Sequence, residues 1–381
     1  MIRARHLSLV LLFVGACGGS DKGSTTPNEV ATTEQTAPAE PVEPPATPAE
    51  TPAQPPPPPP KKLTTEELIK AHDACFAAFV AKDEKKYTDC YTAESTDEMV
   101  DSGMPPAKGA QQALESAKQF WNAFPDMSGA IAMNLGNGNS LAVVAVVTGT
   151  NTAEMMGHPA TNKKFGQYAL EIIDMTDDGR HGNVRLYVDL ATMAAQIGHI
   201  KQKSRPVAKK PDGEPKVAIA TDSETERKNV KTVTDGIEAW NKRDWKAVEA
   251  SYTKDVVFSD QMMTADAKGA KNAVKALQAY AKGFSDGKVK VDKIWGAGDY
   301  VVAEQTFTGT NDGALPAMGV KKKTGKPVTI RFATVLRLEG DKVKEEGLFA
   351  NGMAIAMQLG LMSHDHDKGA EKPEKKPGEK K

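Results

Sequence analysis

Few residues in this chain have types and spacings that could support chemistry. The 381-residue sequence contains no glycine-rich phosphate loop, no histidine and cysteine cluster at metal-binding spacing and no nucleophile elbow. His364 and His366, in the run SHDHD, could hold a metal weakly, but so few ligands in a charged tail are more typical of a solvated segment. Any chemistry would therefore depend on acid and base side chains, and we expect no metal and no other cofactor.

The elements that must position such side chains occur twice. Residues 307–338 read FTGTNDGALPAMGVKKKTGKPVTIRFATVLRL, and residues 148–175 read TGTNTAEMMGHPATNKKFGQYALEIIDM. Each stretch is typical of a strand end, an irregular connection and a new strand. In the second copy the new strand alternates, and one apolar face contains Ile330, Phe332, Thr334, Leu336 and Leu338. Alignment of Ala78-Phe79 with Ala239-Trp240 also brings Asp83 onto Asp244, which indicates one duplicated unit.

Each repeat begins with helix patterns and continues with strand patterns only. Helices are predicted to start at Thr64 and Ser223, and a second helix in each repeat ends near Phe124 or Phe284. This order predicts an α+β fold with two tandem cone-shaped domains, in which a curved antiparallel sheet wraps around the helices and encloses a cavity. We place the domains at residues 63–200 and 222–362, joined by a basic, proline-bearing linker at 201–221.

Two of the three cysteines lie at matched distances from a predicted helix hinge. Cys75 precedes Asp83 and Cys90 follows it, so the two thiols would reach similar heights on neighbouring helices. Gly236 and Ser251 stand at the equivalent positions of the second repeat, so both thiols are missing together. In an oxidising compartment this paired absence favours a disulfide between the first two helices. The alternative is two unrelated buried small residues.

The strand end Thr-Gly-Thr, the Met-Gly loop and the strand start Thr-Gly-Lys-Pro-Val resemble the SnoaL-like polyketide cyclases, or ester cyclases, of the nuclear transport factor 2-like superfamily. The resemblance covers residues 64–200 and 222–362, and the closing segments Gln-Ile-Gly and Gln-Leu-Gly are also similar to the family's. Members of this family commonly pair sheet to sheet as dimers. We expect the two repeats to form that pair within one chain, as a pseudo-dimer.

The resemblance implies a cofactor-independent aldol ring closure, with an aspartate near the end of the last strand as general base. Asp189 in Tyr-Val-Asp-Leu holds that position in the first repeat, where an apolar cavity would raise its pKa. Asn351 in Phe-Ala-Asn-Gly holds it in the second repeat and cannot accept the proton. The polar residues expected to border the cavities, and so to contact a ligand, are Asn351 itself and Tyr91, Asp101, Trp240, Tyr252 and Asp260, with His158 as a weaker candidate. Each could instead be an ordinary core or turn-capping residue.

The N-terminus resembles that of a bacterial lipoprotein. Arg3 and Arg5 precede an apolar run too short to span a bilayer, and Val-Gly-Ala-Cys is similar to a lipobox. We expect a signal peptide at residues 1–16, an acylated Cys17 and a proline-rich tether at 17–62. Gly18 follows the cysteine, so the outer membrane is the expected location, facing the periplasm or the cell surface. The alternative is an ordinary secretory signal with an incidental cysteine. A charged tail occupies residues 363–381.

The composition excludes some partners but does not identify a ligand. The formal net charge of −1 gives no electrostatic basis for nucleic-acid binding. Two hypotheses remain open: a non-catalytic module that binds a small hydrophobic molecule or a protein at the cell envelope, and a cyclase or isomerase that uses Asp189. The 15 methionines favour filled or adaptable pockets, and hence the first hypothesis.

Overall fold

The computed structural model describes residues 62–155 and 157–362. The predicted signal peptide, the acylated Cys17, the tether up to residue 61 and the charged tail from residue 363 lie outside the described residues. The predicted linker at 201–221 is described and contributes a short strand, β7 (Lys216–Ile219).

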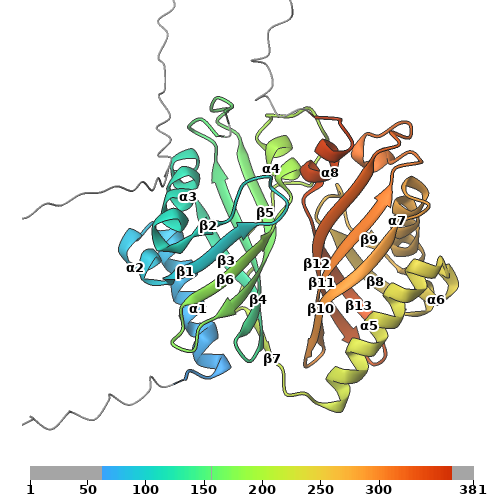
Figure 1. Cartoon of the computed structure of the whole chain (residues 1–381), viewed down its shortest axis with the longest axis horizontal. Helices are drawn as coiled ribbons and strands as arrows, with labels where there is room; N and C mark the ends of the chain where they lie inside the picture. The colour runs from blue at the N-terminus through green and yellow to red at the C-terminus, as the bar shows by residue number, and fades with distance from the viewer. Residues whose placement is uncertain (1–61, 156, 363–381) are drawn as a thin grey trace, which may run out of the picture. The chain divides into compact units, whose positions relative to one another are not determined.

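The first repeat contains four helices and six strands in the described residues, and Figure 1 shows them in blue to green. Its helices are α1 (Thr65–Ala81), α2 (Glu84–Asp89), α3 (Gly109–Ala123) and α4 (Leu190–Gln196). Its strands are β1 (Tyr91–Met99), β2 (Ala107–Lys108), β3 (Ser128–Asn137), β4 (Ser140–Thr150), β5 (Lys164–Met175) and β6 (His181–Tyr187).

The second repeat has the same order of elements, in yellow to red in Figure 1. Its helices are α5 (Glu224–Lys242), α6 (Trp245–Ala250), α7 (Ala270–Gly283), the 3-10 turn η1 (Pro316–Met318) and α8 (Gly352–Gln358). Its strands are β8 (Tyr252–Asp260), β9 (Ala267–Lys268), β10 (Lys288–Ala297), β11 (Tyr300–Thr310), β12 (Pro327–Glu339) and β13 (Lys342–Phe349).

The long first helix of each repeat begins where the sequence predicts. The side chains of Thr64 and Ser223 accept hydrogen bonds from the backbone N–H groups of Glu67 and Glu226, and those glutamates bind back to the capping residue. This reciprocal cap satisfies backbone donors that have no partner inside the helix. Both helices end at a residue in the left-handed conformation, Lys82 and Arg243, which turns the chain into the next helix.

The sheets are mixed, whereas the sequence predicted antiparallel strands throughout. The strand orders are β2-β1-β6-β5-β4-β3-β7 and β10-β11-β12-β13-β8-β9. The first strand of each repeat pairs in parallel with the last, β1 with β6 and β8 with β13. A parallel pair requires a long crossover, and here the helix α3 or α7 and the antiparallel strands between provide it. The α+β architecture with two tandem domains is otherwise confirmed.

Both faces of each sheet are covered. One face packs on the helices of its own repeat and forms the core clusters around Leu68 in the first repeat and Val256 in the second. A further cluster joins the other faces and combines residues of both repeats, among them Val144, Ile172, Val302 and Val335. Burial on both faces explains why the strand at 141–146 is apolar at every position and does not alternate.

Polar contacts also join the two repeats. Arg185 donates to Glu304 at 2.6 Å, and the Tyr187 hydroxyl donates to the same carboxylate at 2.9 Å. On the other side of the contact, Arg331 binds Asp101 through both its backbone N–H, at 2.7 Å, and its guanidinium. These charged groups are partly buried, so removal of one partner would leave the other poorly solvated.

The predicted disulfide is confirmed. Cys75 of α1 is bonded to Cys90, which follows α2, with Cα atoms 5.9 Å apart. It ties the first two helices of the first repeat together across the turn at Asp83. The second repeat has no equivalent bond because Gly236 and Ser251 stand at those positions.

Candidate functional site

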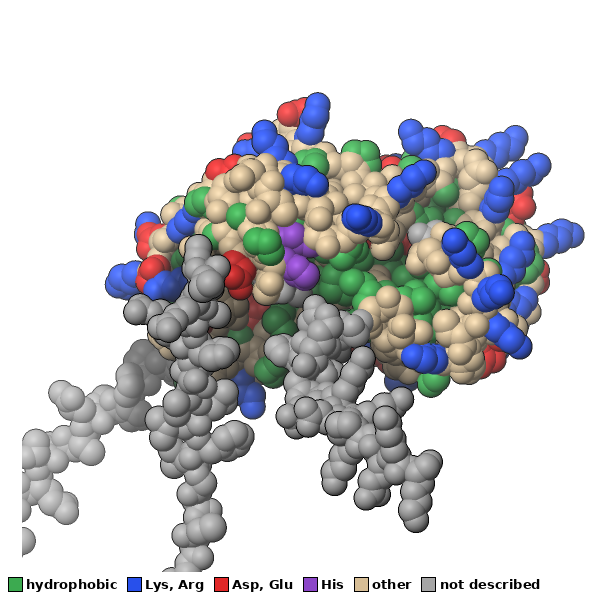
Figure 2. All heavy atoms as spheres, turned by 90° about the horizontal axis from the view of Figure 1, so that it is seen from above, with side chains coloured by type: hydrophobic (Ala, Val, Ile, Leu, Met, Phe, Trp, Pro, Cys, Tyr) green, Lys and Arg blue, Asp and Glu red, His purple; other side chains and the backbone are tan. Residues whose placement is uncertain are grey.

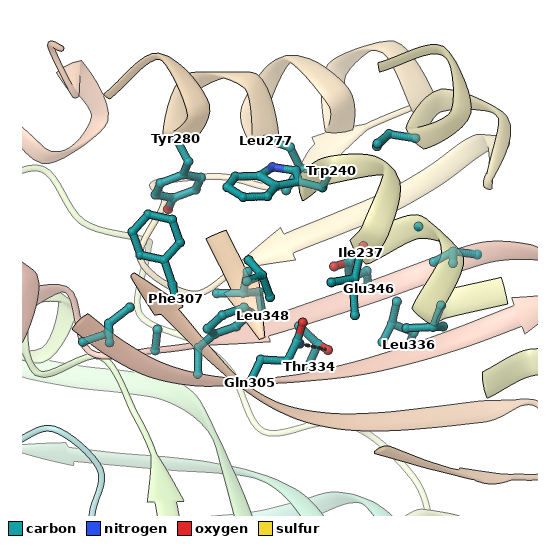
Figure 3. A pocket seen from close by; sticks show the side chains of 18 of the residues that line it. Ile237, Trp240, Leu277, Tyr280, Gln305, Phe307, Thr334, Leu336, Glu346 and Leu348 are labelled. Atoms are coloured by element: carbon teal, nitrogen blue, oxygen red, sulfur yellow. Dashed lines mark hydrogen bonds between the residues drawn. The ribbon is translucent and has the colours of Figure 1, made fainter. Parts of the chain in front are cut away.

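The second repeat contains a cavity of about 140 Å³ between its helices and its sheet. Figure 3 shows side chains from both layers pointing into it. Helix α5 contributes a stripe at helical spacing, Val233, Gly236, Ile237 and Trp240. Strand β12 contributes alternate residues, Val328, Ile330, Phe332, Thr334 and Leu336. The alternating face predicted from the sequence therefore forms a wall of the cavity.

The far end of the cavity is lined by Met318 and Ile355, which belong to η1 and α8. Figure 2 looks at the end of the molecule that carries α4 and α8, and hydrophobic side chains gather there in a hollow bordered by lysine and arginine. The walls are otherwise apolar, which suits a small hydrophobic molecule.

Three hydrogen-bonded pairs lie in or beside the cavity, and Thr232, Trp240 and Ser251 also line it. The Tyr252 hydroxyl donates to Oε2 of Glu346 at 2.6 Å. The Tyr280 hydroxyl donates to Oδ2 of Asp260 at 2.6 Å. The amide of Gln305 donates to the hydroxyl of Thr334 at 3.0 Å, a bond that Figure 3 marks.

The two carboxyl groups of these pairs have raised pKa values because they are buried. Burial raises the pKa of Glu346 to about 7, although the hydrogen bond from Tyr252 opposes the shift. Burial likewise raises the pKa of Asp260 to about 6, against the hydrogen bonds from Tyr280 and from the backbone of Met262. Glu346 lines the cavity, whereas Asp260 lies behind Tyr280.

In the first repeat, larger or cross-linked side chains occupy several of the positions that line this cavity, although Val147 and Ala169 stand where Phe307 and Phe332 do. The disulfide-bonded Cys75 and Cys90 stand at the positions equivalent to Gly236 and Ser251. The backbone N–H of His181 donates to the oxygen of Cys90, and that of Val343 donates to the oxygen of Ser251, so the two regions have equivalent backbone contacts. Phe165 stands where Val328 does, and its ring centroid lies 4.4 Å from that of Phe124. Phe124, Phe165 and the disulfide therefore occupy part of the interior of the first repeat.

A buried histidine pair also distinguishes the first repeat. Nδ1 of His72 lies 3.2 Å from Nε2 of His181, and the other ring nitrogen of each histidine has no hydrogen-bond partner among the described residues. Burial lowers the pKa of both imidazoles, to about 4 for His181, so the pair is neutral near pH 7. Val233 and Val343, which line the cavity, take these positions in the second repeat.

Tyr91, a predicted ligand contact, lies in the packed interior of the first repeat. Its hydroxyl lies 2.9 Å from that of Tyr87 and donates to Asp97 at 2.9 Å. Burial, together with the nearby Asp97, raises the pKa of Glu171 to about 8. Asp97 and Glu171 were not predicted, because strand β1 does not alternate in a way that shows which of its acidic residues point inward.

Asp189, the predicted general base, is positioned as a helix cap. Its carboxylate accepts backbone N–H groups of Ala191 at 3.2 Å and Thr192 at 3.0 Å, at the start of α4. It also accepts the N–H of Gly352 in the other repeat, at 2.9 Å. Asp189 is buried and does not line the described cavity. Burial raises its pKa, but the geometry gives no support to a role as a base that faces a substrate.

The other predicted contacts divide into two groups. Trp240 and Tyr252 line the cavity, and Asp260 lies next to it. Asn351 instead caps α8 and donates to the backbone oxygen of Asp101. Asp101, predicted to border a cavity of the first repeat, does not line the described cavity, and its carboxylate binds Arg331 of the other repeat. The sequence could not show this contact, which joins residues 230 positions apart.

Glu346 is the main residue that the sequence analysis missed. Simple alternation along β13 would place Val343 and Glu346 on opposite faces, yet both line the cavity. The pairing of β13 with β8 shifts register between Val343 and Glu345, and an irregularity of this kind reverses the side-chain direction. The only sequence signal is the acidic pair Glu345-Glu346 within a strand.

Three further features concern possible partners. In the described part of the chain no three His, Cys, Asp or Glu side chains gather in a way that could hold a metal ion. His158 lies in the loop after β4, with its ring 4.9 Å from that of His199, and away from the described cavity. None of the helices at residues 62–155 and 157–362 is long and apolar enough to cross a bilayer.

Comparisons with known proteins agree with the duplicated architecture. The sequence profile of the family described as SnoaL-like polyketide cyclase matches residues 68–197 and again 231–359. No protein with curated function matches the chain.

Solved structures match one repeat at a time. A putative SnoaL-like polyketide cyclase from Jannaschia sp. CCS1 is 21% identical, with a TM-score of 0.35, and the match covers 38% of this chain and 99% of that one. IdmH, a putative polyketide cyclase from Streptomyces antibioticus, is 22% identical with a TM-score of 0.32, covering 35% and 99%. A putative SnoaL-like polyketide cyclase from Shewanella putrefaciens CN-32 is 19% identical with a TM-score of 0.31, covering 37% and 89%. Because the family profile matches both repeats, and these together make up most of the chain, the protein belongs to the SnoaL-like polyketide cyclase family.

Proposed function

We propose that the protein binds a small hydrophobic molecule in the cavity of its second repeat, and that the first repeat is a filled, structural partner. The observation that carries this proposal is the difference between the two interiors. Several positions that line the cavity correspond, in the first repeat, to a disulfide, a histidine pair and Phe165. A cavity of about 140 Å³ is close in size to an engineered apolar cavity that binds benzene.

The alternative is a cofactor-independent cyclase or isomerase that uses Asp189 as its base. That reaction needs a carboxylate that faces the substrate, and Asp189 instead accepts three backbone N–H groups at a helix start. The equivalent residue of the repeat that contains the cavity is Asn351, which cannot act as a base. Non-catalytic binding therefore agrees better with the geometry.

Thermal unfolding with small apolar probes tests the binding proposal. A ligand that binds only the folded state at 100 times its Kd stabilises by about 2.7 kcal/mol. We expect indole and toluene to raise the Tm of the wild-type protein. Val233→Phe should abolish this shift because it fills the cavity, and Val207→Phe, at a 43% exposed linker position, should retain it. Equal probe shifts in both variants would contradict the proposal.

We further propose that the repeats form a fixed intrachain pair and that acylated Cys17 anchors the protein to the outer membrane. The core cluster shared by both sheets and the ion pair from Arg185 to Glu304 support the first part. The lipobox-like sequence supports the second. For the intrachain pair, a monomeric solution mass with one cooperative unfolding transition is expected for residues 62–362.

The membrane anchor has its own test. Mass spectrometry of the full-length protein should find an acylated N-terminal Cys17, and Cys17→Ser should release the protein from the membrane fraction.

A further inference from the structure

The cavity of the second repeat contains an acid but no base. Among its lining residues the only ionisable side chains are Tyr252, Tyr280 and Glu346, and none is lysine, arginine or histidine. An ionised carboxylate buried without a cation is costly, and natural proteins usually pair such a group. Glu346 has only the hydroxyl of Tyr252 as a hydrogen-bond partner, on Oε2, which leaves its other oxygen, Oε1, without one in the described residues.

Three of the hydrogen-bond donors around the cavity are directed at carboxylate or hydroxyl acceptors of the protein. Tyr252 donates to Glu346, Tyr280 donates to Asp260, and the amide of Gln305 donates to Thr334. A ligand whose polar group only accepts hydrogen bonds, such as a ketone, could use these three donors only by breaking one of these bonds, and near Glu346 the donor Tyr252 is already engaged. A ligand that donates would find the carboxylate oxygen of Glu346 free.

We propose that the cavity of the second repeat takes a small apolar amine, whose protonated nitrogen donates to Oε1 of Glu346 while its hydrocarbon part packs on the apolar walls. This inference rests on the proposed function and narrows it to one ligand class. The ammonium group supplies the positive charge that the cavity lacks, and a charge-assisted hydrogen bond inside an apolar site is stronger than a neutral one.

The surrounding side chains suit such a ligand. In Figure 3 the rings of Trp240, Tyr280 and Phe307 lie on one side of the cavity, and aromatic faces attract cations. The hydrocarbon part would contact Phe332 and Leu336 of β12.

The charge state of Glu346 makes amine binding depend on pH. Burial raises the pKa of Glu346 to about 7, and the neighbouring Asp260 adds to the shift, while Tyr252 opposes it. An alkylamine keeps its proton up to a pH of about 10, as lysine does. Below pH 6 most of the Glu346 population is neutral, and an ammonium ion must displace that proton to solvent on binding. Affinity for the amine should therefore rise between pH 5 and pH 8, while affinity for a neutral probe should not.

Three probes of similar shape test the proposal: 4-fluorobenzylamine, 4-fluorobenzyl alcohol and 4-fluorotoluene. The affinity of each is measured by fluorine NMR titration at pH 5 and at pH 8. We expect the amine to bind at least tenfold more tightly than the alcohol at pH 8 and to lose most of this preference at pH 5. Glu346→Gln should remove the preference and retain 4-fluorotoluene binding. The carboxylate of Glu345 pairs with Arg337 and does not line the cavity, so the matched control Glu345→Gln should keep the preference for the amine.

The possible failures can be told apart. If the alcohol or 4-fluorotoluene binds as tightly as the amine at pH 8, the amine proposal is wrong and the hydrophobic cavity stands. If the preference survives Glu346→Gln, the nitrogen binds elsewhere and the proposal is also wrong. If none of the three probes binds, the proposed function itself is refuted.

Discussion

The disulfide of the first repeat can be transplanted into the second, and the structure predicts the outcome. A Cβ atom built on Gly236 would lie 4.0 Å from Cβ of Ser251, within the 3.5–4.5 Å range of natural disulfides. Gly236 has a helical backbone and no contact closer than 3.6 Å, so a cysteine fits there without strain. The double variant Gly236→Cys/Ser251→Cys should therefore form a bond spontaneously under oxidising conditions.

The expected stabilisation follows from the length of the closed loop. Positions 236 and 251 are separated by 15 residues, like Cys75 and Cys90. A disulfide that closes a loop of that length restricts the unfolded chain, which stabilises the folded state by about 3 kcal/mol. For a domain of this size, a change of 1 kcal/mol in the free energy of unfolding shifts the Tm by about 2–4 °C. The Tm of the oxidised variant should therefore exceed that of its reduced form by about 6–12 °C. The new sulfur atoms would also enter the cavity, since both positions line it.

Thiol titration, calorimetry and probe binding report these effects separately. Denatured, unreduced protein should show no free thiol from the two introduced cysteines, and binding of 4-fluorotoluene should weaken. Gly236→Ser is the control, because it adds a side chain of similar size that cannot form a bridge. If the introduced thiols stay free after oxidation, the superposition of the two repeats is wrong, and so is the argument that the disulfide helps to fill the first interior.

Three further variants test separate parts of the structure. Glu304→Gln should lower the free energy of unfolding in urea by about 1–2 kcal/mol, because Arg185 loses one ionic partner but keeps Asp174. An unchanged free energy of unfolding would show that the contact between the repeats is weak in solution. Glu346 has a folded pKa of about 7 against a usual 4.5, so its contribution to stability is complete below about pH 4.5 and is lost as the pH rises through 7. Compared with Glu346→Gln, the ligand-free wild type should lose about 3 kcal/mol over this range, and parallel pH profiles would refute the raised pKa. Asp189→Asn should cost about 1–2 kcal/mol as a weakened helix cap and leave 4-fluorotoluene binding unchanged; a lost probe signal in a folded variant would place Asp189 at the ligand.

Local sequence patterns predicted much of the fold because they depend on nearby residues. The helix starts at Thr64 and Ser223, the alternating face of β12 and the disulfide were all accessible from spacing and from comparison of the two repeats. The parallel pairing of first and last strands was not, because the helix and strand patterns between them do not specify which distant edges meet.

The candidate site was harder to predict because long-range geometry determines it. Glu346 faces the cavity only because of an irregularity in strand pairing that leaves no clear mark in the sequence. Asp189 was assigned from the family resemblance, but its third backbone partner, Gly352, comes from the other repeat. Whether an interior is open depends on how side chains fill it, and the exchange of Phe165 for Val328 looks conservative in the sequence alone.

The most direct test of the account is a crystal structure of residues 62–362 under xenon pressure, since xenon enters apolar cavities that are otherwise empty or weakly hydrated. The account predicts xenon in the second repeat, in contact with Trp240 and Phe332, and none between Phe124 and Phe165 of the first. Xenon in the first interior, or in neither, would contradict the claim that the second repeat alone retains the binding site.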